Sequence, residues 1–429
     1  MTSKSILICT VGGSHQPIVT ACRDLNPGFV CFVCSGKDPG TGKPGSDTQI
    51  LGKGLCIKAR HEDDKPTLPN IPAHVGLPEN SFEVVIVPPD DLDTAVAIIR
   101  AALSSLTDRF PGHSLIADYT GGTKSMSAAL VIEALEREDV ELQLVTGNRA
   151  NLVKVQDGTE ASSPAIADAV RLNRAMSPYL AAWDRFAYDE AAAGLTRLRS
   201  PRNSQLRNQL NRARDLSRAF AAWDRFDHAE ALRLLEGYAP KISRELGAHL
   251  GALKMLVVPA PQQEPMRLFD LWRNAERRAA QGRYDDAVAR VYRLIEWSAQ
   301  WLLRACCGID TADIPLERIP PGMDIPPGRD GRRQAGLYTA WLLVERLAEG
   351  PAHDFAATRL PELLGHLQIR NESILAHGFS PIRMGEWEQI RSWMDSTFFP
   401  MLLAELARNR EFRIHTLPPQ LPSEYCWRE

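Results

Sequence analysis

The sequence predicts an α/β N-terminal domain built on a parallel sheet, followed by an all-α linker with helical repeats and a C-terminal all-α bundle. Two observations predict this order. Up to about residue 155, short apolar runs alternate with segments of helical periodicity, as in parallel strands joined by right-handed crossovers. Beyond that point the strand signal stops and apolar residues recur at helical spacing. We therefore divide the chain into residues 1–155, 156–266 and 267–429.

Five short apolar runs, each followed by turn residues, indicate five strands in the N-terminal domain. Residues 36–80 are rich in Gly, Pro, Asp and Lys and are expected to be mostly loop, with one short helix. Cys31 and Cys34 form a C-x-x-C pair within an apolar run. No second pair completes a zinc site, so we interpret them as buried strand cysteines. The strands are expected at residues 5–11, 28–34, 83–87, 114–118 and 140–146, with helices near 16–25, 93–106 and 124–137.

The helical linker contains an internal repeat. Residues 181–186, Ala-Ala-Trp-Asp-Arg-Phe, recur at 221–226, and residues 282–287 resemble them more loosely. A spacing near forty predicts stacked helical hairpins in which Trp183 and Trp223 are core anchors. The alternative is that these tryptophans are exposed and dock another protein. The C-terminal bundle is expected to contain helices at 284–306, 336–349, 360–377 and 386–406, with a loop at 314–331.

Composition sets limits on function. Apolar residues make up 44% of the chain and charged residues 24%, which is ordinary for a globular protein. The formal net charge of -3 gives no global indication of nucleic-acid binding, although a local basic cleft remains compatible with it. No apolar run has transmembrane length, and the N-terminus lacks the pattern of a signal peptide, so we expect a cytoplasmic protein without membrane partners.

Two glycine turns follow the first and fourth expected strands. Glycine lets backbone amides approach a ligand closely, and amides at a helix N-terminus favour phosphate. Both turns could also be no more than tight strand-to-helix connections. The residues concerned are Gly12, Gly13 and Ser14 in the first turn and Thr120, Gly121, Gly122, Thr123 and Lys124 in the second.

Residues 118–126, Asp-Tyr-Thr-Gly-Gly-Thr-Lys-Ser-Met, resemble the D-x-T-G-G-T-K-x-M signature of CARF domains. These are Rossmann-like sensors of cyclic oligoadenylates in type III CRISPR systems, and the resemblance covers about residues 4–155. It implies that two such domains pair and bind the ligand across their symmetry axis. By position, both glycine turns line that site, and Asn148 after the fifth strand is a further ligand-binding candidate.

Arg370 and His377 close an expected helix. Residues seven apart lie on nearly the same helix face, so the two side chains would project together. A histidine can move protons near neutral pH, and an arginine can stabilise charge developing on a phosphate, which suits metal-independent RNA cleavage through the 2′-hydroxyl. Asn371 could orient the phosphate or support His377. The structural alternative is that both cations complement the helix dipole.

This segment is similar to the R-x(4–6)-H motif of HEPN ribonucleases, here with six intervening residues and Asn371 directly after the arginine. The resemblance covers about residues 268–410 and gains weight from the CARF-like domain upstream. Residues 287–296 look like the opening helix of that bundle. Glu296 is interpreted there as a charge satisfied by an inward-facing arginine, with a functional role as the weaker reading.

Together the resemblances imply a homodimeric CARF–HEPN effector of antiviral defence. The expected activity is an endoribonuclease that cuts single-stranded RNA to a 2′,3′-cyclic phosphate, with no metal cofactor. A cyclic oligoadenylate, which we expect to be cyclic tetra-adenylate, would activate it allosterically. Hydroxyls such as Thr10, Ser14 or Thr120 could also let the sensor degrade its activator. The alternative function is that of a catalytically inactive, ligand-regulated binding protein. The sequence speaks against it in one respect, because it contains no recognition helix and no basic helix suited to DNA.

Overall fold

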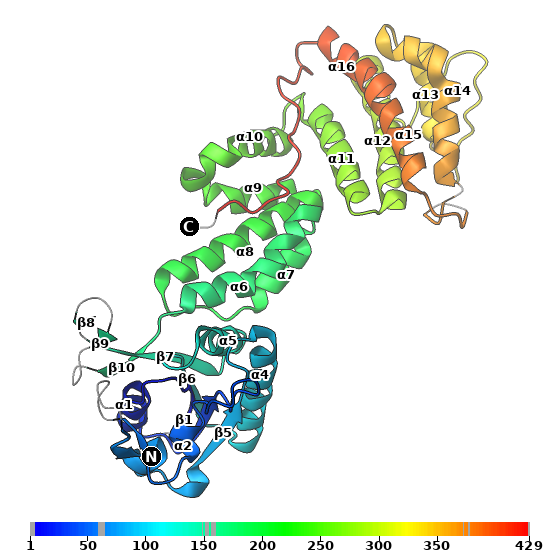
Figure 1. Ribbon diagram of the computed structural model, residues 1–429. Coiled ribbons are helices and arrows are strands. Elements are labelled where there is room, and N and C mark those ends of the chain that lie inside the picture. Colours follow the sequence, from blue (N-terminus) through cyan, green and yellow to red (C-terminus); the bar gives the residue numbers. More distant parts are fainter. Residues whose placement is uncertain are drawn as a thin grey trace. The chain divides into compact units, whose positions relative to one another are not determined.

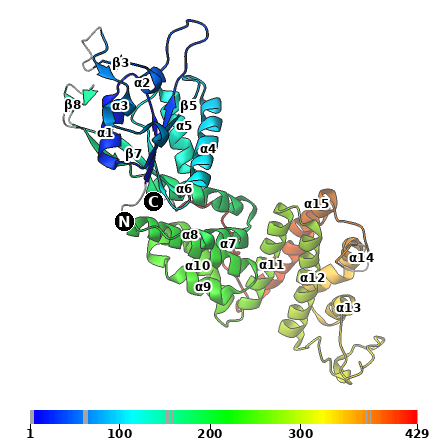
Figure 2. The same cartoon turned by 90° about the horizontal axis from the view of Figure 1, so that it is seen from below.

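The computed structural model describes residues 5–58, 65–147, 149–150, 154–155, 160–371, 373–375 and 378–427. The side chains of residues 149–150, 154–155, 241–245, 367, 370 and 371 lie outside this description. The chain divides into two compact units, Met1–Arg174 and Ala175–Glu429, which are described separately (Figures 1 and 2).

A six-stranded sheet forms the first unit, with the strand order β10-β7-β6-β1-β2-β5 (Figure 1). All neighbouring strands are parallel except β10, which pairs antiparallel with β7. The five expected strands are confirmed to within a residue at each end. They are β1 (Ser5–Thr10), β2 (Phe29–Cys34), β5 (Phe82–Ile86), β6 (Ser114–Asp118) and β7 (Val140–Thr146), joined by β10 (Ala161–Pro164).

Helices cover both faces of this sheet because the central strands alternate apolar side chains between two cores. Ile6 and Ile8 face the core shared with α4 (Leu92–Arg109) and α5 (Lys124–Leu135). Leu7 faces the core on the opposite side of the sheet. Such two-sided burial explains why the parallel strands are continuous apolar runs. The opposite core is covered by α1 (Gln16–Leu25), α2 (Thr48–Leu51) and α3 (Ile71–Val75).

Two expectations for the first unit were wrong. The strand signal does not stop at residue 155, because β10 pairs with the edge of β7. Its sequence, Ala-Ser-Ser-Pro, carries no apolar run, since an edge strand needs only backbone pairing. Residues 36–80 contain more structure than one short helix. They form α2 and α3, and β3 (Leu55–Ile57) pairs with β4 (Leu68–Pro69).

Cys31 and Cys34 are fully buried in β2, which confirms their interpretation as strand cysteines. Burial raises the pKa of the Cys34 thiol to about 12 and that of Cys31 well above its usual value. Among the described residues, no group of His, Cys, Asp and Glu has the geometry of a metal site. No helix in the described part of the chain is long and apolar enough to cross a membrane.

The second unit is helical throughout its regular structure. Its expected closing helix is interrupted by a π turn at Met394–Phe398. The helix α6 (Asp168–Leu180) spans the boundary between the units. The remaining helices are α7 (Tyr188–Arg197), α8 (Ser204–Asp224), α9 (His228–Glu236), α10 (Ala239–Val257), α11 (Gln263–Ala280), α12 (Tyr284–Cys307), α13 (Leu337–Leu347), α14 (Pro351–Asn371), α15 (Met384–Trp393) and α16 (Phe399–Arg408).

The sequence repeat forms a recurring turn between helices. Phe186 and Phe226 both have left-handed backbones, with φ of 57° and 67°, and Gly282 occupies the same place before α12 with φ of 73°. The amides of Phe186 and Phe226 each donate to the carbonyl of the preceding tryptophan at 2.8 Å. Trp183 and Trp223 have no exposed surface, which confirms them as core anchors and removes the alternative that they dock a partner.

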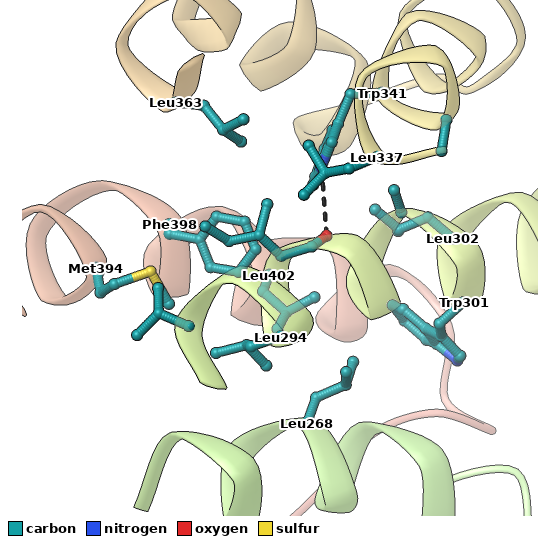
Figure 3. Close-up of a cluster of buried hydrophobic side chains, with 14 of the residues drawn as sticks. Leu268, Leu294, Trp301, Leu302, Leu337, Trp341, Leu363, Met394, Phe398 and Leu402 are labelled. Carbon is teal, nitrogen blue, oxygen red and sulfur yellow. Dashed lines mark hydrogen bonds between the residues drawn. The ribbon is translucent and has the colours of Figure 1, made fainter. Parts of the chain in front are cut away.

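The C-terminal bundle packs α11 to α16 around one apolar core (Figure 3). Leu294 and Trp301 of α12 lie opposite Trp341 of α13 and Phe398 of the π turn. The buried Trp341 indole donates to the Ile295 carbonyl at 3.2 Å, so its polar atom is satisfied inside the core.

The segment after α16 returns to the linker helices. The Tyr188 hydroxyl donates to the Pro422 carbonyl at 2.6 Å, and Nε2 of His249 lies 3.0 Å from the Gln420 carbonyl. Tyr425 packs edge-on against Trp183 with ring centroids 5.3 Å apart. Residues 409–427, called the C-terminal strap below, therefore tie the linker to the bundle.

Candidate functional site

The candidate ligand site lies where the strand order of the first unit reverses. Strands β1 and β6 are adjacent and parallel, and their chain continuations lead in opposite directions along the sheet. In open α/β sheets, this switch point leaves a crevice outside the carboxyl ends of the strands. Both glycine turns begin at that edge, so the fold brings the two sequence signals together.

The two turns are in backbone contact. A Cβ added to Gly12 would lie 2.7 Å from the amide nitrogen of Gly122, closer than real Cβ atoms come. A Cβ on Gly121 would lie 2.2 Å from the Thr10 carbonyl oxygen. Gly122 has φ of +82°, which disfavours any other residue. These three glycines are required by packing, which is the structural explanation for their presence.

Side chains around the turns fix their backbones. The Thr10 hydroxyl donates to the Gly121 carbonyl at 2.7 Å, and the Asp118 carboxylate accepts from the Thr120 amide at 2.9 Å. The Thr120 hydroxyl oxygen accepts from the Val145 amide at 2.7 Å. Burial raises the pKa of the Asp118 carboxyl, and its hydrogen bonds with Thr120 oppose that shift.

Thr123 caps the N-terminus of α5. Its hydroxyl oxygen accepts from the Met126 amide at 3.3 Å and its proton is donated to the Pro89 carbonyl. The first turn of α5 has no acidic residue, and Lys124 there is exposed. Unpaired amides, the positive end of the helix dipole and a free ammonium on one turn favour an anion such as phosphate.

Some of the predicted ligand-binding residues are open to a ligand, and others are already hydrogen-bonded within the protein. Gly13 and Ser14 are exposed, and a Cβ on Gly13 would meet nothing within 4 Å, so this part of the first turn is open to a ligand. The hydroxyl protons of Thr10 and Thr123 are already donated within the protein, and the Thr120 hydroxyl is engaged by the Val145 amide and the Asp118 carboxylate. Asn148 lies outside the described residues.

Sequence reasoning missed one group near this site. The side-chain amide of Gln49, at the start of α2, donates to the Gly12 carbonyl. This contact links residues 36–80 to the first glycine turn. No local motif marks Gln49, because the link depends on how a loop packs back onto the sheet.

The candidate catalytic segment lies at the end of α14 in the second unit. Arg370 and Asn371 are the last two residues of that helix, and His377 lies outside the described residues. The expected helix over 360–377 was wrong at both ends, since α14 runs from Pro351 to Asn371. Because α14 ends before His377, helical spacing does not place Arg370 and His377 on one face, and the choice of these residues stays a prediction.

The chain after α14 buries a polar side chain and exposes apolar ones. Ser373 is 1% exposed, and its hydroxyl has no hydrogen-bond partner among the described residues. Ile374 and Leu375 are exposed, and Phe379 is 93% exposed. The amide of Gly378 donates to the Ser373 carbonyl at 3.2 Å, which closes this loop. Three exposed apolar side chains thus lie beside the candidate catalytic residues in the sequence.

His366 is a nearby titratable group that sequence reasoning also missed. It lies on α14, four residues before Arg370 in the sequence. Its ring is 4.8 Å from that of Trp393, and burial lowers its pKa. The spacing of His366 and Arg370 along the sequence could have indicated this histidine.

Glu296, which was expected to pair with an inward-facing arginine, is partly exposed and pairs with Arg293 of its own helix at 2.7 Å.

A cavity of about 480 Å³ lies between α11, α12 and α15. Its charged lining is largely paired already, because Arg273 contacts Glu276 at 2.8 Å. None of the residues that line it comes from α14. We therefore assign the candidate catalytic site to the end of α14 and not to this cavity.

Comparison with known proteins identifies the helical domain. Residues 259–398 match the family model described as the Csm6 HEPN domain. The structure is similar to Enterococcus italicus Csm6 bound to cyclic hexa-2′-fluoro-hexa-dAMP, with a TM-score of 0.56, 12% identity and 95% of each chain covered. At that identity the likeness shows the fold. Can2 from Sulfobacillus thermosulfidooxidans, solved with cyclic tetra-adenylate, matches with a TM-score of 0.24 and 11% identity over 57% of this chain and 69% of its own. No curated protein matches the sequence.

These findings confirm the expected arrangement. The chain has a parallel α/β unit followed by a helical unit that contains a HEPN domain, and its fold is that of Csm6. They support the resemblance to CARF–HEPN effectors of type III CRISPR systems.

Proposed function

We propose that this protein is an endoribonuclease of type III CRISPR defence that a cyclic oligoadenylate activates. The observation that carries the proposal is the position of the two motifs. Arg370 and His377 fall inside the matched HEPN segment, residues 259–398, and the glycine turns lie at the switch point of the preceding sheet. A sensor and a nuclease are thus joined in the order that CARF–HEPN effectors have.

The proposed ligand site binds phosphates of the cyclic oligoadenylate. The exposed Gly13 and Ser14, the N-terminus of α5 and Lys124 supply amide, hydroxyl and ammonium donors. Cyclic tetra-adenylate is the activator we expect. Cyclic hexa-adenylate is the second candidate, because Csm6 of the same fold was solved with a six-membered analogue.

The proposed reaction is attack of an RNA 2′-hydroxyl on the adjacent phosphorus. His377 removes the hydroxyl proton, the bond from the 2′-oxygen to phosphorus forms, and the bond to the 5′-oxygen breaks. Arg370 stabilises the charge on the phosphoryl oxygens, and Asn371 orients the phosphate. A proton returns to the leaving oxygen, so the products are a 2′,3′-cyclic phosphate and a 5′-hydroxyl. This chemistry proceeds without a metal ion.

We further propose that two chains form the active enzyme. The exposed Ile374, Leu375 and Phe379 lie next to the catalytic residues in the sequence, where a second copy of the bundle would cover them. Pairing would bring Arg370 and His377 of both chains into one composite cleft. Ligand bound to paired sensor domains would then shift the bundles between inactive and active packing.

Incubating the purified protein with end-labelled RNA, without ligand and with each cyclic oligoadenylate, tests the proposal. We expect cleavage only with a ligand, and a loss of about 100-fold to 10,000-fold in rate for His377→Ala. His415→Ala is the matched control, because His415 is an exposed histidine of the same unit, and it should cleave at the wild-type rate. Ligand-independent cleavage, or full activity of His377→Ala, would contradict the proposal.

The same assay distinguishes the proposed nuclease from the alternative, a ligand-regulated binding protein without catalysis. Such a protein would bind a cyclic oligoadenylate but leave the RNA intact at every ligand concentration.

A further inference from the structure

Arginines concentrate at one end of the α7–α8 hairpin. Residues 197–218 contain seven arginines and no lysine, and Asp215 is their only acidic residue, in a chain whose net charge is -3. These arginines do not form a basic helix suited to DNA, because they are spread over a loop and two helices. Five of them are exposed, and the four that lie at or next to the loop, Arg197, Arg199, Arg202 and Arg207, are called the arginine patch below.

Two of the other three arginines of this run have structural partners. Arg212 donates to the Trp427 carbonyl at 3.3 Å, and Arg214 donates to the Leu195 carbonyl at 3.4 Å. These two are accounted for by packing. Arg218 is exposed farther along α8 and is not counted in the patch.

Within the patch, Arg207 donates to the carbonyls of Arg202 at 3.4 Å and Pro201 at 3.5 Å in the adjacent loop. None of the four forms an ion pair with any residue that the structure describes. Exposed arginines elsewhere in the same hairpins are paired, as Arg185 is with Glu190 at 2.6 Å and Arg233 with Glu230 at 2.6 Å. A group of unpaired like charges raises the free energy of the folded protein, so an anionic partner would stabilise it.

Two helix ends meet at this corner, the C-terminus of α7 and the N-terminus of α8, and only the second favours an anion. Helix α8 begins here, is capped by the neutral Asn203 and has no acidic residue in its first turn. The Arg207 side chain lies back over the loop, with its terminal nitrogen 3.4 Å from the Arg202 carbonyl. Arg197 has a structural explanation, since a cation in the last turn of α7 complements that helix dipole. Arg207 holds the loop carbonyls, and the described part of the chain offers no structural explanation for Arg199 and Arg202.

We propose that the arginine patch binds the phosphate backbone of single-stranded RNA outside the catalytic cleft. Guanidinium groups bind phosphate oxygens in pairs of hydrogen bonds, and a loop with several such groups follows a flexible strand without reading its bases. The inference rests on the proposed function for the identity of the polyanion. The patch would hold long substrates near the enzyme, and RNAs too short to reach it would gain nothing.

The triple variant Arg199→Gln, Arg202→Gln, Arg207→Gln tests this in full-length protein that also carries His377→Ala to keep the RNA intact. Binding of a fluorescein-labelled single-stranded RNA is measured by anisotropy over a range of salt. We expect affinity to fall about tenfold at low salt, and the slope of log affinity against log salt to fall by about 2, since each phosphate contact contributes about 0.7.

The matched control replaces three arginines whose charges are already paired. Arg185→Gln, Arg225→Gln, Arg233→Gln removes the same total charge from the same hairpins. We expect its RNA affinity and salt slope to stay near those of the parent protein. Equal losses in both triple variants would overturn the proposal, because they would indicate a general charge effect.

Cleavage separates this inference from the proposed function. With His377 present, the patch variant should cut a trinucleotide at the wild-type rate and a long RNA more slowly. Unchanged anisotropy and an unchanged rate on long RNA would overturn the patch as an RNA site and favour an acidic protein as its partner. Absence of cleavage by the wild type would contradict the proposed function, while the anisotropy would still decide whether the patch binds RNA.

Discussion

Gly12→Ala tests whether backbone contact between the glycine turns determines the ligand site. The added Cβ would lie 2.7 Å from the Gly122 nitrogen, where ordinary contact begins at 3.4 Å, so the turns must separate by about 0.7 Å (3.4 − 2.7). Overpacking of this kind costs about 1–3 kcal/mol. Because each kcal/mol lowers the Tm of a domain of this size by roughly 2–4 °C, we expect a decrease of about 2–12 °C in the Tm of the first unit.

The same displacement should weaken ligand binding. Misplacing binding groups by close to 1 Å costs up to about 100-fold, so we expect the Kd for the activating cyclic oligoadenylate to rise about 10-fold to 100-fold. Isothermal titration calorimetry on the full-length protein measures that Kd, and differential scanning calorimetry measures the Tm.

Gly28→Ala is the matched control for this experiment. A Cβ at Gly28 would lie 3.8 Å from the Ser5 carbonyl oxygen, an ordinary contact at the opposite edge of the sheet. It should keep the wild-type Tm and Kd. A wild-type Tm and Kd for Gly12→Ala would refute the reasoning, and a lowered Tm with an unchanged Kd would refute its second step.

Three further predictions concern buried or partly buried polar groups. Thr120→Val removes the acceptor of the Val145 amide and should lower the free energy of unfolding in urea by about 1–3 kcal/mol, whereas Thr120→Ser should retain most of it. Trp223→Phe removes the donor to the buried Asp270 carboxylate, 2.9 Å away, and should also cost about 1–3 kcal/mol; an unchanged urea midpoint would contradict this. Burial lowers the pKa of His249, so the folded state binds fewer protons than the unfolded state just below pH 6.5. Stability should therefore fall as the pH drops from about 7.5 to about 5.5, and urea midpoints of His249→Gln should show a smaller fall than those of the wild type.

Much of the first unit could be predicted from the sequence because its parallel strands are buried on both faces. Each such strand is an apolar run that pattern alone reveals. The strand β10 could not be found this way, since Ala161–Pro164 pairs through its backbone at a sheet edge. The glycine turns were identified correctly, but sequence could not tell that Gly12 and Gly122 are held by mutual contact and Gly13 is not.

The end of α14 shows why the catalytic segment was harder. Residues 370–377 contain good helix formers, so propensity and spacing predicted a continuing helix. The structure ends the helix at Asn371, buries Ser373 and exposes Ile374. Local propensity is a weak guide where tertiary packing decides the outcome. The left-handed Phe186 and Phe226 were likewise invisible to propensity, and only their repetition in the sequence marked the turn.

The C-terminal strap has a consequence for how the protein is made. The hydrogen bond between Tyr188 and Pro422 joins residues 234 positions apart, and Tyr425 contacts Trp183 from a similar distance along the chain. Contacts of such long range form late, because a long loop must first close. On the ribosome, the linker helices emerge well before the strap, so they must wait for translation to pass through the whole HEPN domain before their aromatic core is complete. The first unit has no such dependence, since the hydrogen bonds described for its glycine turns lie within the first 174 residues. A nascent chain would therefore complete the turns of its proposed ligand site before its linker had packed.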